Sequence, residues 1–417
     1  MAKVLMIAYE APPVGGSGVQ RTSKFAKYLP RFDWKPVIFT RDDNVALKDL
    51  SLLGDIEESL VVRTKAHDYS QWPGKLSLVG KAIIKLFLIP DGSIVWKKRS
   101  VKLACETVIN EGIDLIYSTS TPYSDHLLGL ELKRKFPSIP WVVDFRDEWT
   151  MNPYTLDNPH NFIRRSMEKK MEREVVENAD AIVINTPIMR KHFIEMYPFI
   201  EEKSYVIPNG FDSEDFPERS VVGEKNCKFR MVYTGLLYGR RKPDSFLEGL
   251  SMAIKEGKID KEKLEVVFIG NYIEKEIQRV IDGFSLRDVV RMLPYMPHEE
   301  CLQNMVDSDV LLLIEGTGRG AEAFYTGKLF EYMKAGQFVF GVIPPQGVAA
   351  DLIKEANIGL VCDYDKAEDI RDGIIEVYNE WVEKGVVPFS PNQEIIDRYE
   401  RKNLTKELVN IFERLRR

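Results

Sequence analysis

The sequence is poor in cysteine, and the few that it has are scattered. Cys105, Cys227, Cys301 and Cys362 lie far apart and include no CxxC pair. Their spacing offers no disulfide framework and no Cys/His zinc cluster, and it suits a reducing compartment. We therefore expect each cysteine to be a small buried apolar residue.

Long apolar runs and long runs of one charge are also missing. No stretch approaches the roughly 18 apolar residues that a membrane-spanning helix needs, and the apolar residues before Glu10 are too few for a signal peptide. The net charge is −6 without a basic cluster of the kind that binds nucleic acid. We expect a cytoplasmic protein, either soluble or peripheral on the inner face of the membrane, with no nucleic-acid partner.

What the sequence does have is the patterning of an α/β protein. Its 417 residues exceed what one hydrophobic core supports. Short apolar runs such as Val4–Ala8 and Val310–Ile314 are typical of strands buried on both faces, Trp141–Phe145 is a further predicted strand, and amphipathic helical stretches separate them. This alternation predicts doubly wound parallel sheets.

A polar stretch, Asp212–Lys228, divides two such series and is typical of a linker. We therefore predict two Rossmann-like domains that face a cleft. The first covers residues 1–210 and the second residues 211–394, and a C-terminal helix of about 395–417 packs back on the first. Parallel sheets bind ligands outside the carboxyl ends of their strands, so two ligands could bind on opposite walls of the cleft.

A glycine loop follows the first predicted strand. Gly15, Gly16 and Gly18 precede a helix, and glycine amides at a helix N-terminus can approach an anion closely. The alternative is a tight turn with no ligand. Arg21 stands where the third glycine of a GxGxxG dinucleotide fingerprint would be, which disfavours an NAD oxidoreductase.

Four segments, in order, resemble the retaining glycosyltransferases of family 4, which have the GT-B fold. None is specific alone, but together they cover nearly the whole chain. They are Pro12–Arg21, Thr121–His126 with Val143–Trp149, Tyr233–Arg241, and Thr326–Gly336.

The resemblance implies a donor site for a UDP- or GDP-linked sugar. Guanidinium groups offer forks of donors to the phosphates of the leaving group, and a carboxylate can accept from both ribose hydroxyls. As alternatives, Arg240 and Arg241 could form only a solvated basic turn, and Glu331 could form only an exposed ion pair with Lys328. The implied donor-binding residues are Gly16, Gly18, Gly235, Arg240, Arg241, Lys328, Leu329 and Glu331.

Three residues are candidates for the reacting centre. The resemblance puts His126 against the donor sugar, and we assign Asp147 to the acceptor hydroxyl. The family's second glutamate would fall at position 323, which is Ala323 here, so we assign Glu322 beside it. Arg146 has a structural interpretation, as a partner of Asp144 or Asp147.

No metal and no cofactor are expected. Asp307-Ser308-Asp309 matches the DxD pattern of metal-dependent transferases, but it leads directly into the apolar run 310–314 and so marks the start of a buried strand. Similar GT-B enzymes use arginines and helix dipoles instead.

Residues 75–99 combine apolar, lysine and tryptophan residues. This composition suits a helix lying in a membrane surface, although a core-facing helix fits equally well. A membrane contact would suit a lipid-linked acceptor, whereas a sugar acceptor needs none.

The sequence therefore predicts a retaining glycosyltransferase of the hexosyltransferase type. It would move a sugar from a nucleoside diphosphate sugar to an acceptor hydroxyl, in the synthesis of cell-surface polysaccharide or glycoconjugate. A GT-B sugar-nucleotide epimerase and a non-catalytic nucleotide-sugar-binding protein are the alternatives. The nucleotide base, the donor sugar and the acceptor do not follow from the sequence.

Overall fold

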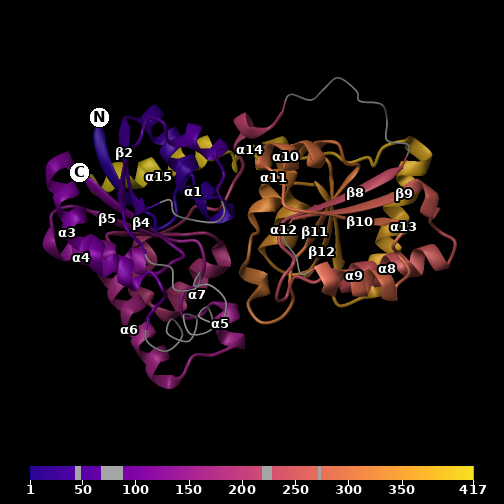
Figure 1. The fold of residues 1–417 in the computed structure, drawn as a ribbon, viewed down its shortest axis with the longest axis horizontal. Coiled ribbons are helices and arrows are strands. Elements are labelled where there is room, and N and C mark those ends of the chain that lie inside the picture. The colour runs from indigo at the N-terminus through magenta and orange to yellow at the C-terminus, as the bar shows by residue number, and fades with distance from the viewer. Residues whose placement is uncertain (43–47, 67–87, 218–227, 271–273, 417) are drawn as a thin grey trace. The chain divides into compact units, whose positions relative to one another are not determined.

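The chain folds into two compact units. Unit 1 comprises Met1–Pro208 and Arg401–Arg417, and unit 2 comprises Asn209–Glu400. The structure, a computed structural model, describes residues 1–42, 48–66, 88–217, 228–270 and 274–416 (Figure 1). Residues 218–227 of the predicted linker and Cys227 therefore lie outside the described part.

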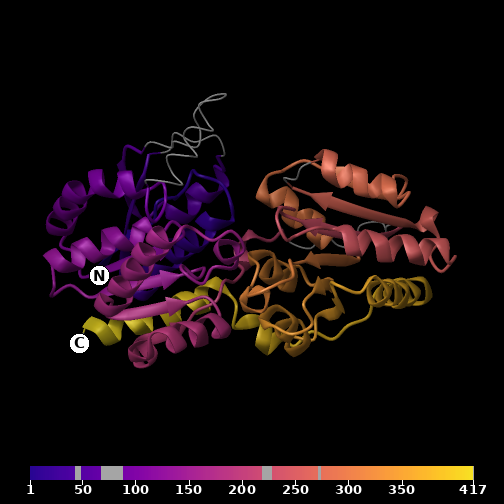
Figure 2. The same ribbon diagram turned by 90° about the horizontal axis from the view of Figure 1, so that it is seen from below.

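Unit 1 is built on a parallel sheet of seven described strands in the order β3-β2-β1-β4-β5-β6-β7. Helices cover both faces of this sheet (Figures 1 and 2). The strands are β1 (Ala2–Ile7), β2 (Trp34–Arg41), β3 (Leu60–Thr64), β4 (Leu115–Ser120), β5 (Trp141–Phe145), β6 (Ala181–Ile184) and β7 (Ser204–Val206). The helices are α1 (Ser17–Tyr28), α3 (Ile94–Glu111), α4 (Ser124–Lys135), α5 (Pro153–Asp157), α6 (Phe162–Asn178), α7 (Pro187–Met196) and α15 (Arg401–Arg416).

The last helix, α15, closes the core of unit 1. Leu404, Leu408 and Phe412 of this helix are buried with residues of β1, β4 and α1. The ring of Phe412 lies edge-on to Trp34, with the ring centroids 5.1 Å apart. Two distant parts of the chain thus share one hydrophobic core.

Unit 2 has a parallel sheet of six described strands in the order β10-β9-β8-β11-β12-β13. The strands are β8 (Phe229–Thr234), β9 (Leu264–Ile269), β10 (Val290–Leu293), β11 (Val310–Ile314), β12 (Phe338–Ile343) and β13 (Gly359–Asp363). The helices are α8 (Asp244–Lys255), α9 (Glu274–Gly283), α10 (His298–Val306), α11 (Gly327–Ala335), α12 (Val348–Glu355), α13 (Ala367–Lys384) and α14 (Gln393–Asp397).

Alternate residues of β11 belong to two separate cores, one on each face of this sheet. Val310, Leu312 and Ile314 pack with α8, α9 and α13, whereas Leu311 and Leu313 pack with α10, α11, α12 and α14. Because both faces are buried, the strand reads as one continuous apolar run in the sequence. The predicted pair of doubly wound parallel sheets is confirmed.

The described cysteines are free thiols, but they are not uniformly buried. Cys362 is buried, while Cys105 and Cys301 are partly exposed. The expectation that each is a buried core residue is therefore wrong for two of the three. Cys105 lies on α3, and Cys301 lies in the first turn of α10, beside the candidate site described below.

Candidate functional site

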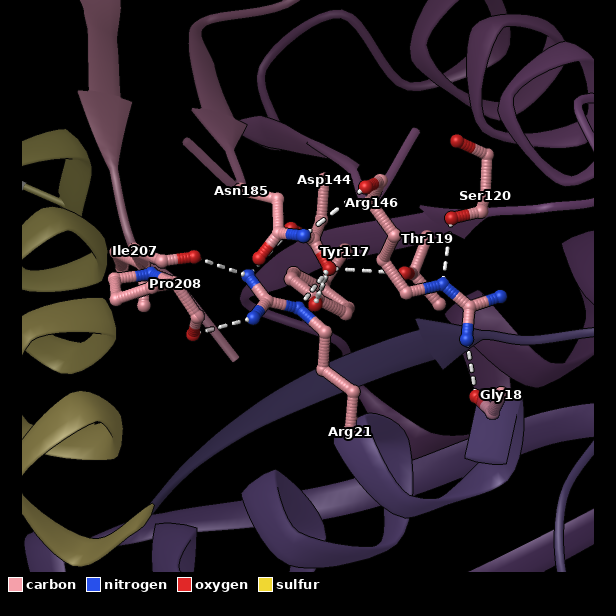
Figure 3. A network of polar contacts seen from close by, with 10 residues as sticks. All are labelled: Gly18, Arg21, Tyr117, Thr119, Ser120, Asp144, Arg146, Asn185, Ile207 and Pro208. Carbon is pink, nitrogen blue, oxygen red and sulfur yellow. Dashed lines mark hydrogen bonds and ion pairs between the residues drawn. The ribbon is translucent and has the colours of Figure 1, made fainter. Parts of the chain in front are cut away.

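The carboxyl edge of the unit 1 sheet is held together by a buried ion pair. Arg21 of α1 makes two hydrogen bonds to Asp144 of β5, Nε to Oδ2 and Nη2 to Oδ1, both 2.8 Å long (Figure 3). Arg21 also donates to the carbonyls of Ile207 and Pro208, each at 2.8 Å. The arginine that replaces a fingerprint glycine thus joins α1 to β5 and to the end of β7.

Two further side chains donate to the same carboxylate. The hydroxyls of Tyr117 and Thr119 lie 2.5 Å and 2.9 Å from Asp144 Oδ2. Burial opposes ionisation, but the charge of Arg21 and these hydrogen bonds lower the pKa of Asp144 below its usual value. Asp144 is therefore a charged structural anchor, and the role of Asp147 at the acceptor hydroxyl stays a prediction.

Arg146 has a structural role, as expected, but its partner is not Asp144. Because Arg21 occupies Asp144, Arg146 turns to backbone carbonyls instead (Figure 3). It donates to Ser120 at 2.6 Å and to Thr121 at 2.5 Å, and it also donates to Gly18. Arg146 thereby ties the glycine loop to the end of β4. Asp147 follows it at the same edge and is partly exposed.

The glycine loop begins α1 without a side-chain cap. Gly16 precedes the helix with φ +113°, a left-handed backbone that L side chains rarely adopt, and a Cβ there would meet nothing within 4 Å. Backbone geometry, not space, requires this glycine. Gly18, two residues on, is exposed. The amino end of α1 thus presents backbone at the carboxyl edge of the sheet, where an anion can bind.

His126 lies in the first turn of α4 and is fully buried. Its Nδ1 lies 2.9 Å from the Ser118 hydroxyl, and its ring packs edge-on against Phe145. Burial lowers the pKa of His126 from 6.5 to about 3, so the ring is neutral at physiological pH. Its Nε2 has no hydrogen-bond partner among the described residues. This buried nitrogen therefore has unused hydrogen-bonding capacity.

Asp125, next to His126, was not assigned from the sequence. It accepts the backbone amide of Tyr9 through Oδ2 at 2.7 Å, while its buried Oδ1 has no partner in the described part of the chain. Burial raises its pKa well above the usual value. Two neighbouring side chains thus each keep one unpaired buried atom, which a hydrogen-bonding ligand would satisfy.

In unit 2, the candidate site begins with Lys328 in the first turn of α11. Its Nζ donates to the Tyr233 hydroxyl at 2.7 Å and lies over the Tyr233 ring, 3.9 Å from the centroid. Gly235, just after β8, has φ +114°, and a Cβ there would lie 3.0 Å from Lys328 Nζ. The glycine therefore leaves room for the lysine. Tyr233 carried no assignment from the sequence, because a strand tyrosine resembles any core aromatic residue.

The charges around Lys328 do not balance locally. Burial first, and then the nearby Arg241, lower the pKa of Lys328 well below its usual value, while Glu315 and Glu331 act against them. Glu315 follows β11, is buried, and accepts the Thr326 amide at 3.3 Å. Burial raises the pKa of Glu315. Burial thus disfavours the charged forms of both Lys328 and Glu315 beside Arg241, and a bound anion would favour the charged form of Lys328.

Glu331 lies one turn after Lys328 on the same helix. Its Oε1 is 2.9 Å from Nε2 of His298, the first residue of α10, and the two side chains are only 15% and 19% exposed. Glu331 is therefore a half-buried carboxylate held by a histidine and not merely part of a surface pair with Lys328. Nothing in the sequence links His298, 33 positions earlier, to this glutamate.

The two neighbouring arginines have different surroundings. Arg240 donates to the Arg319 carbonyl at 2.9 Å and packs along Gly316 and Gly318. Arg241 acts electrostatically on both Lys328 and Glu315. Arg241 thus shares the charged site, while Arg240 contacts the loop after β11. The donor-binding role of both arginines stays a prediction.

The remaining candidates of unit 2 lie on or near α11. The side chain of Leu329 is buried in the core, so this residue can offer a ligand only backbone atoms. Ala323 is also buried, while Glu322 beside it is partly exposed. The Thr326 hydroxyl, at the N-cap of α11, is buried and has no partner among the described residues.

The DxD triplet lies away from this site. Asp309 accepts the Arg230 amide at 2.8 Å and precedes β11, so it stands at the amino end of that strand. Glu315, in contrast, follows the carboxyl end of the same strand. The interpretation of the triplet as the start of a strand is confirmed.

The described part of the 75–99 stretch is not a free amphipathic helix. Residues 75–87 lie outside the described residues. Trp96, on α3, is buried and packs edge-on against Tyr9, with the centroids 5.2 Å apart. No described helix is both long and apolar enough to cross a bilayer.

Sequence comparison relates part of the chain to known glycosyltransferases. Residues 16–215 match the sequence model of Glycosyltransferase Family 4. A D-inositol 3-phosphate glycosyltransferase of Kineococcus radiotolerans is 25% identical over 153 residues, which are 34% of this chain and 35% of that protein. The chain therefore spans about a third of the length of the curated relative that it matches.

Solved structures resemble the whole chain. A glycosyltransferase from Rickettsia africae has a TM-score of 0.66 at 14% identity and covers 99% of this chain and 98% of its own. A mutant of S. aureus TarM, in complex with fondaparinux, α-GlcNAc-glycerol and UDP, has a TM-score of 0.60 at 12% identity and covers 99% and 100%. These solved structures show that the fold is GT-B.

Proposed function

We propose that the protein is a glycosyltransferase that moves a sugar from a nucleoside diphosphate sugar to an acceptor hydroxyl, with retention of configuration. The observation that carries the proposal is the charged group at the carboxyl edge of the unit 2 sheet. Lys328, Arg241 and the amino end of α11 offer positive charge there, and Glu331 offers a half-buried carboxylate one turn away. A nucleoside diphosphate has the complementary chemistry, namely two phosphates and a ribose diol.

In this proposal the leaving group is stabilised by the chain's own cations. Negative charge grows on the diphosphate as the bond to the sugar breaks, and preorganised cations and helix amides lower the energy of that state. Lys328 and Arg241 act directly, Gly235 leaves space for Lys328, and Glu331 accepts from the ribose. The TarM complex with UDP supports a nucleotide of this class.

The acceptor side is assigned to unit 1. His126 is neutral, so we propose that its unpaired Nε2 accepts a hydrogen bond from a hydroxyl and does not serve as a cation. Asp147 orients the attacking hydroxyl of a sugar or lipid-linked acceptor, in the synthesis of a surface polysaccharide or glycoconjugate at the cytoplasmic side of the membrane. Glu322 takes the place of the family's second glutamate at the donor sugar.

The nucleotide assignment is tested by calorimetry with UDP and GDP. Glu331→Ala should lower the affinity for the preferred nucleotide about tenfold or more, because charge-assisted hydrogen bonds are worth about 1.5–3 kcal/mol. Glu376→Ala, at an exposed glutamate of α13, is the matched control and should bind as the wild type does. Equal affinity in the two variants would refute the ribose assignment.

The phosphate assignment has a protonation signature. Since the pKa of Lys328 is well below 10.5 in the free protein, a bound diphosphate should raise it and cause proton uptake at pH values between the two. Calorimetry in buffers of different ionisation enthalpy measures that uptake. Lys328→Arg keeps the charge but cannot change its protonation state, so the uptake should vanish. Uptake that persists in this variant would place the diphosphate elsewhere.

Ala323 is the reason to test two alternatives to sugar transfer, because its buried side chain offers a sugar no hydrogen bond. A protein that binds the nucleotide sugar without transferring it, or that epimerises it, would use the same nucleotide site. Product analysis with a nucleotide-sugar panel separates the three: a new glycoside supports transfer, a free epimer supports epimerisation, and unchanged donor supports binding alone.

A further inference from the structure

The amino-terminal part of α6 carries the most exposed large apolar side chains of the described helices. Phe162 is 84% exposed and Ile163 is 71% exposed. Met167, one turn after Ile163, is 42% exposed. These three residues form an apolar tip on the surface of unit 1, where burial would be favourable.

Basic side chains follow the apolar tip along the same surface. Arg165 and Lys169 continue the row of Phe162 at helical spacing, and Lys170 continues the row of Ile163 and Met167. Both Arg165 and Lys169 are exposed, and no ion pair involves either of them within the described residues. Arg173 ends the basic stretch, paired with Glu177 at 2.7 Å.

The glutamates of this stretch point the other way. Glu168 is buried and accepts from Arg164 at 2.8 Å, and the buried Glu172 accepts from Thr150 and from Tyr197. The exposed surface from Phe162 to Arg173 therefore carries four basic residues and no acidic one. Two of the four have an acidic partner just beyond this surface, since Lys170 lies 4.0 Å from Glu174 and Arg173 pairs with Glu177, so Arg165 and Lys169 carry the excess charge. This local excess stands out in a chain whose net charge is −6.

We infer that the exposed surface of α6 from Phe162 to Arg173 binds an anionic lipid surface. A small apolar tip ringed by lysine and arginine suits a bilayer, which accepts a few inserted side chains and attracts basic residues through its surface charge. A protein partner is less suited, since stable protein interfaces bury about 800 Å² per partner and are depleted in lysine.

The position of the surface agrees with this inference. Helices that connect parallel strands run back from the carboxyl edge of the sheet, so the first turn of α6 lies at the edge that carries His126 and Asp147. A bilayer at α6 would lie at the acceptor end of unit 1. The inference does not require the proposed function, because lipid binding can be measured without any donor.

Flotation of the full chain with vesicles tests the inference. We expect binding to vesicles of phosphatidylcholine mixed with phosphatidylglycerol, little binding to phosphatidylcholine alone, and release by high salt. Phe162→Ser with Ile163→Ser should weaken binding more than about tenfold, from the lost apolar burial. Lys169→Glu with Lys170→Glu should weaken it at least about tenfold.

Matched variants elsewhere make the result specific. Ile109→Ser removes an apolar side chain that is 67% exposed on α3, and Lys255→Glu with Lys258→Glu reverses two exposed lysines of unit 2. Both should bind vesicles as the wild type does. In Phe162→Trp, the tryptophan fluorescence should shift to shorter wavelength when anionic vesicles are added, because the new side chain would enter the bilayer.

Several outcomes would overturn the inference. Equal binding by the α6 variants and the controls would place any lipid contact elsewhere. A melting temperature several degrees lower in Phe162→Ser with Ile163→Ser would show that the chain itself covers these side chains. A change in sedimentation mass without lipid would identify the surface as a protein interface.

Discussion

At the scale of single residues, the sequence indicates which side chains are unusual but not which of them do chemistry. Arg21 is identified by its place in the glycine loop, yet its role follows only from Asp144, which lies 123 positions away. Glu331 is identified by the resemblance, but its partner His298 is not. Spacing along a helix fixes near neighbours, whereas partners across a sheet depend on how the strands are ordered.

The Arg21–Asp144 pair gives a prediction about stability. Asp144→Asn removes the charge that compensates a buried guanidinium, and breaking a buried pair typically costs about 3–5 kcal/mol. Urea unfolding at neutral pH should show a loss of at least about 3 kcal/mol in the free energy of unfolding. Asp157→Asn, at an exposed aspartate of α5, should change it by less than about 0.5 kcal/mol. A loss in Asp144→Asn as small as in the control would contradict the buried pair.

His126 gives a prediction about pH. Its pKa is about 3 in the folded protein, compared with 6.5 for an exposed histidine. Between these two pH values, His126 is protonated in the unfolded chain but remains neutral in the folded chain. The contribution of His126 to the free energy of unfolding is therefore complete above pH 6.5 and falls by about 1.4 kcal/mol per pH unit below it. His126→Asn lacks this effect, so the difference in unfolding free energy between wild type and variant should shrink as the pH falls. A difference that stays constant with pH would mean that His126 titrates normally.

At the scale of elements, continuous apolar runs predicted the central strands of both sheets. Strands such as β5 and β11 are buried on both faces, so β11 shows no polar residue and β5 shows only the buried Asp144. Two of the four edge strands, β3 and β10, were not predicted, because each is short, partly exposed and interrupted by an arginine, Arg63 or Arg291. Edge strands carry fewer buried residues, and their signal weakens accordingly.

The turn after β8 gives a prediction that separates strain from function. Gly235→Ala should strain a left-handed backbone and push Lys328 from its place over Tyr233, so UDP affinity should fall about tenfold. Gly257→Ala imposes a similar strain at φ +67°, but a Cβ there meets nothing within 4 Å. Both variants should lose about 1–2 kcal/mol of stability, and only Gly235→Ala should lose affinity in calorimetry. Equal affinity in the two would remove Lys328 from the diphosphate site.

At the scale of the whole molecule, chain order does not decide which core a segment joins. α15 ends the chain, yet it completes the core that β1 begins, and unit 2 is inserted between Pro208 and Arg401. A helical pattern predicts that α15 exists, but its apolar stripe fits many cores. The resemblance, and not the pattern, therefore suggested where this helix packs.

This arrangement gives a prediction about how a cavity in the core of unit 1 affects each of the two units. Phe412→Ala empties a site between Trp34 and Tyr117, and a buried Phe→Ala substitution costs about 3–5 kcal/mol. Hydrogen exchange should quicken in β1, β2 and α1 of unit 1, where Phe412 packs, and stay unchanged in β8 and β9 of unit 2. Phe199→Ala, at a phenylalanine 49% exposed in unit 1, should leave both patterns unaltered. Faster exchange in β8 and β9 as well would show that the two units unfold as one, because a cavity confined to unit 1 cannot otherwise weaken the hydrogen bonds of the other sheet.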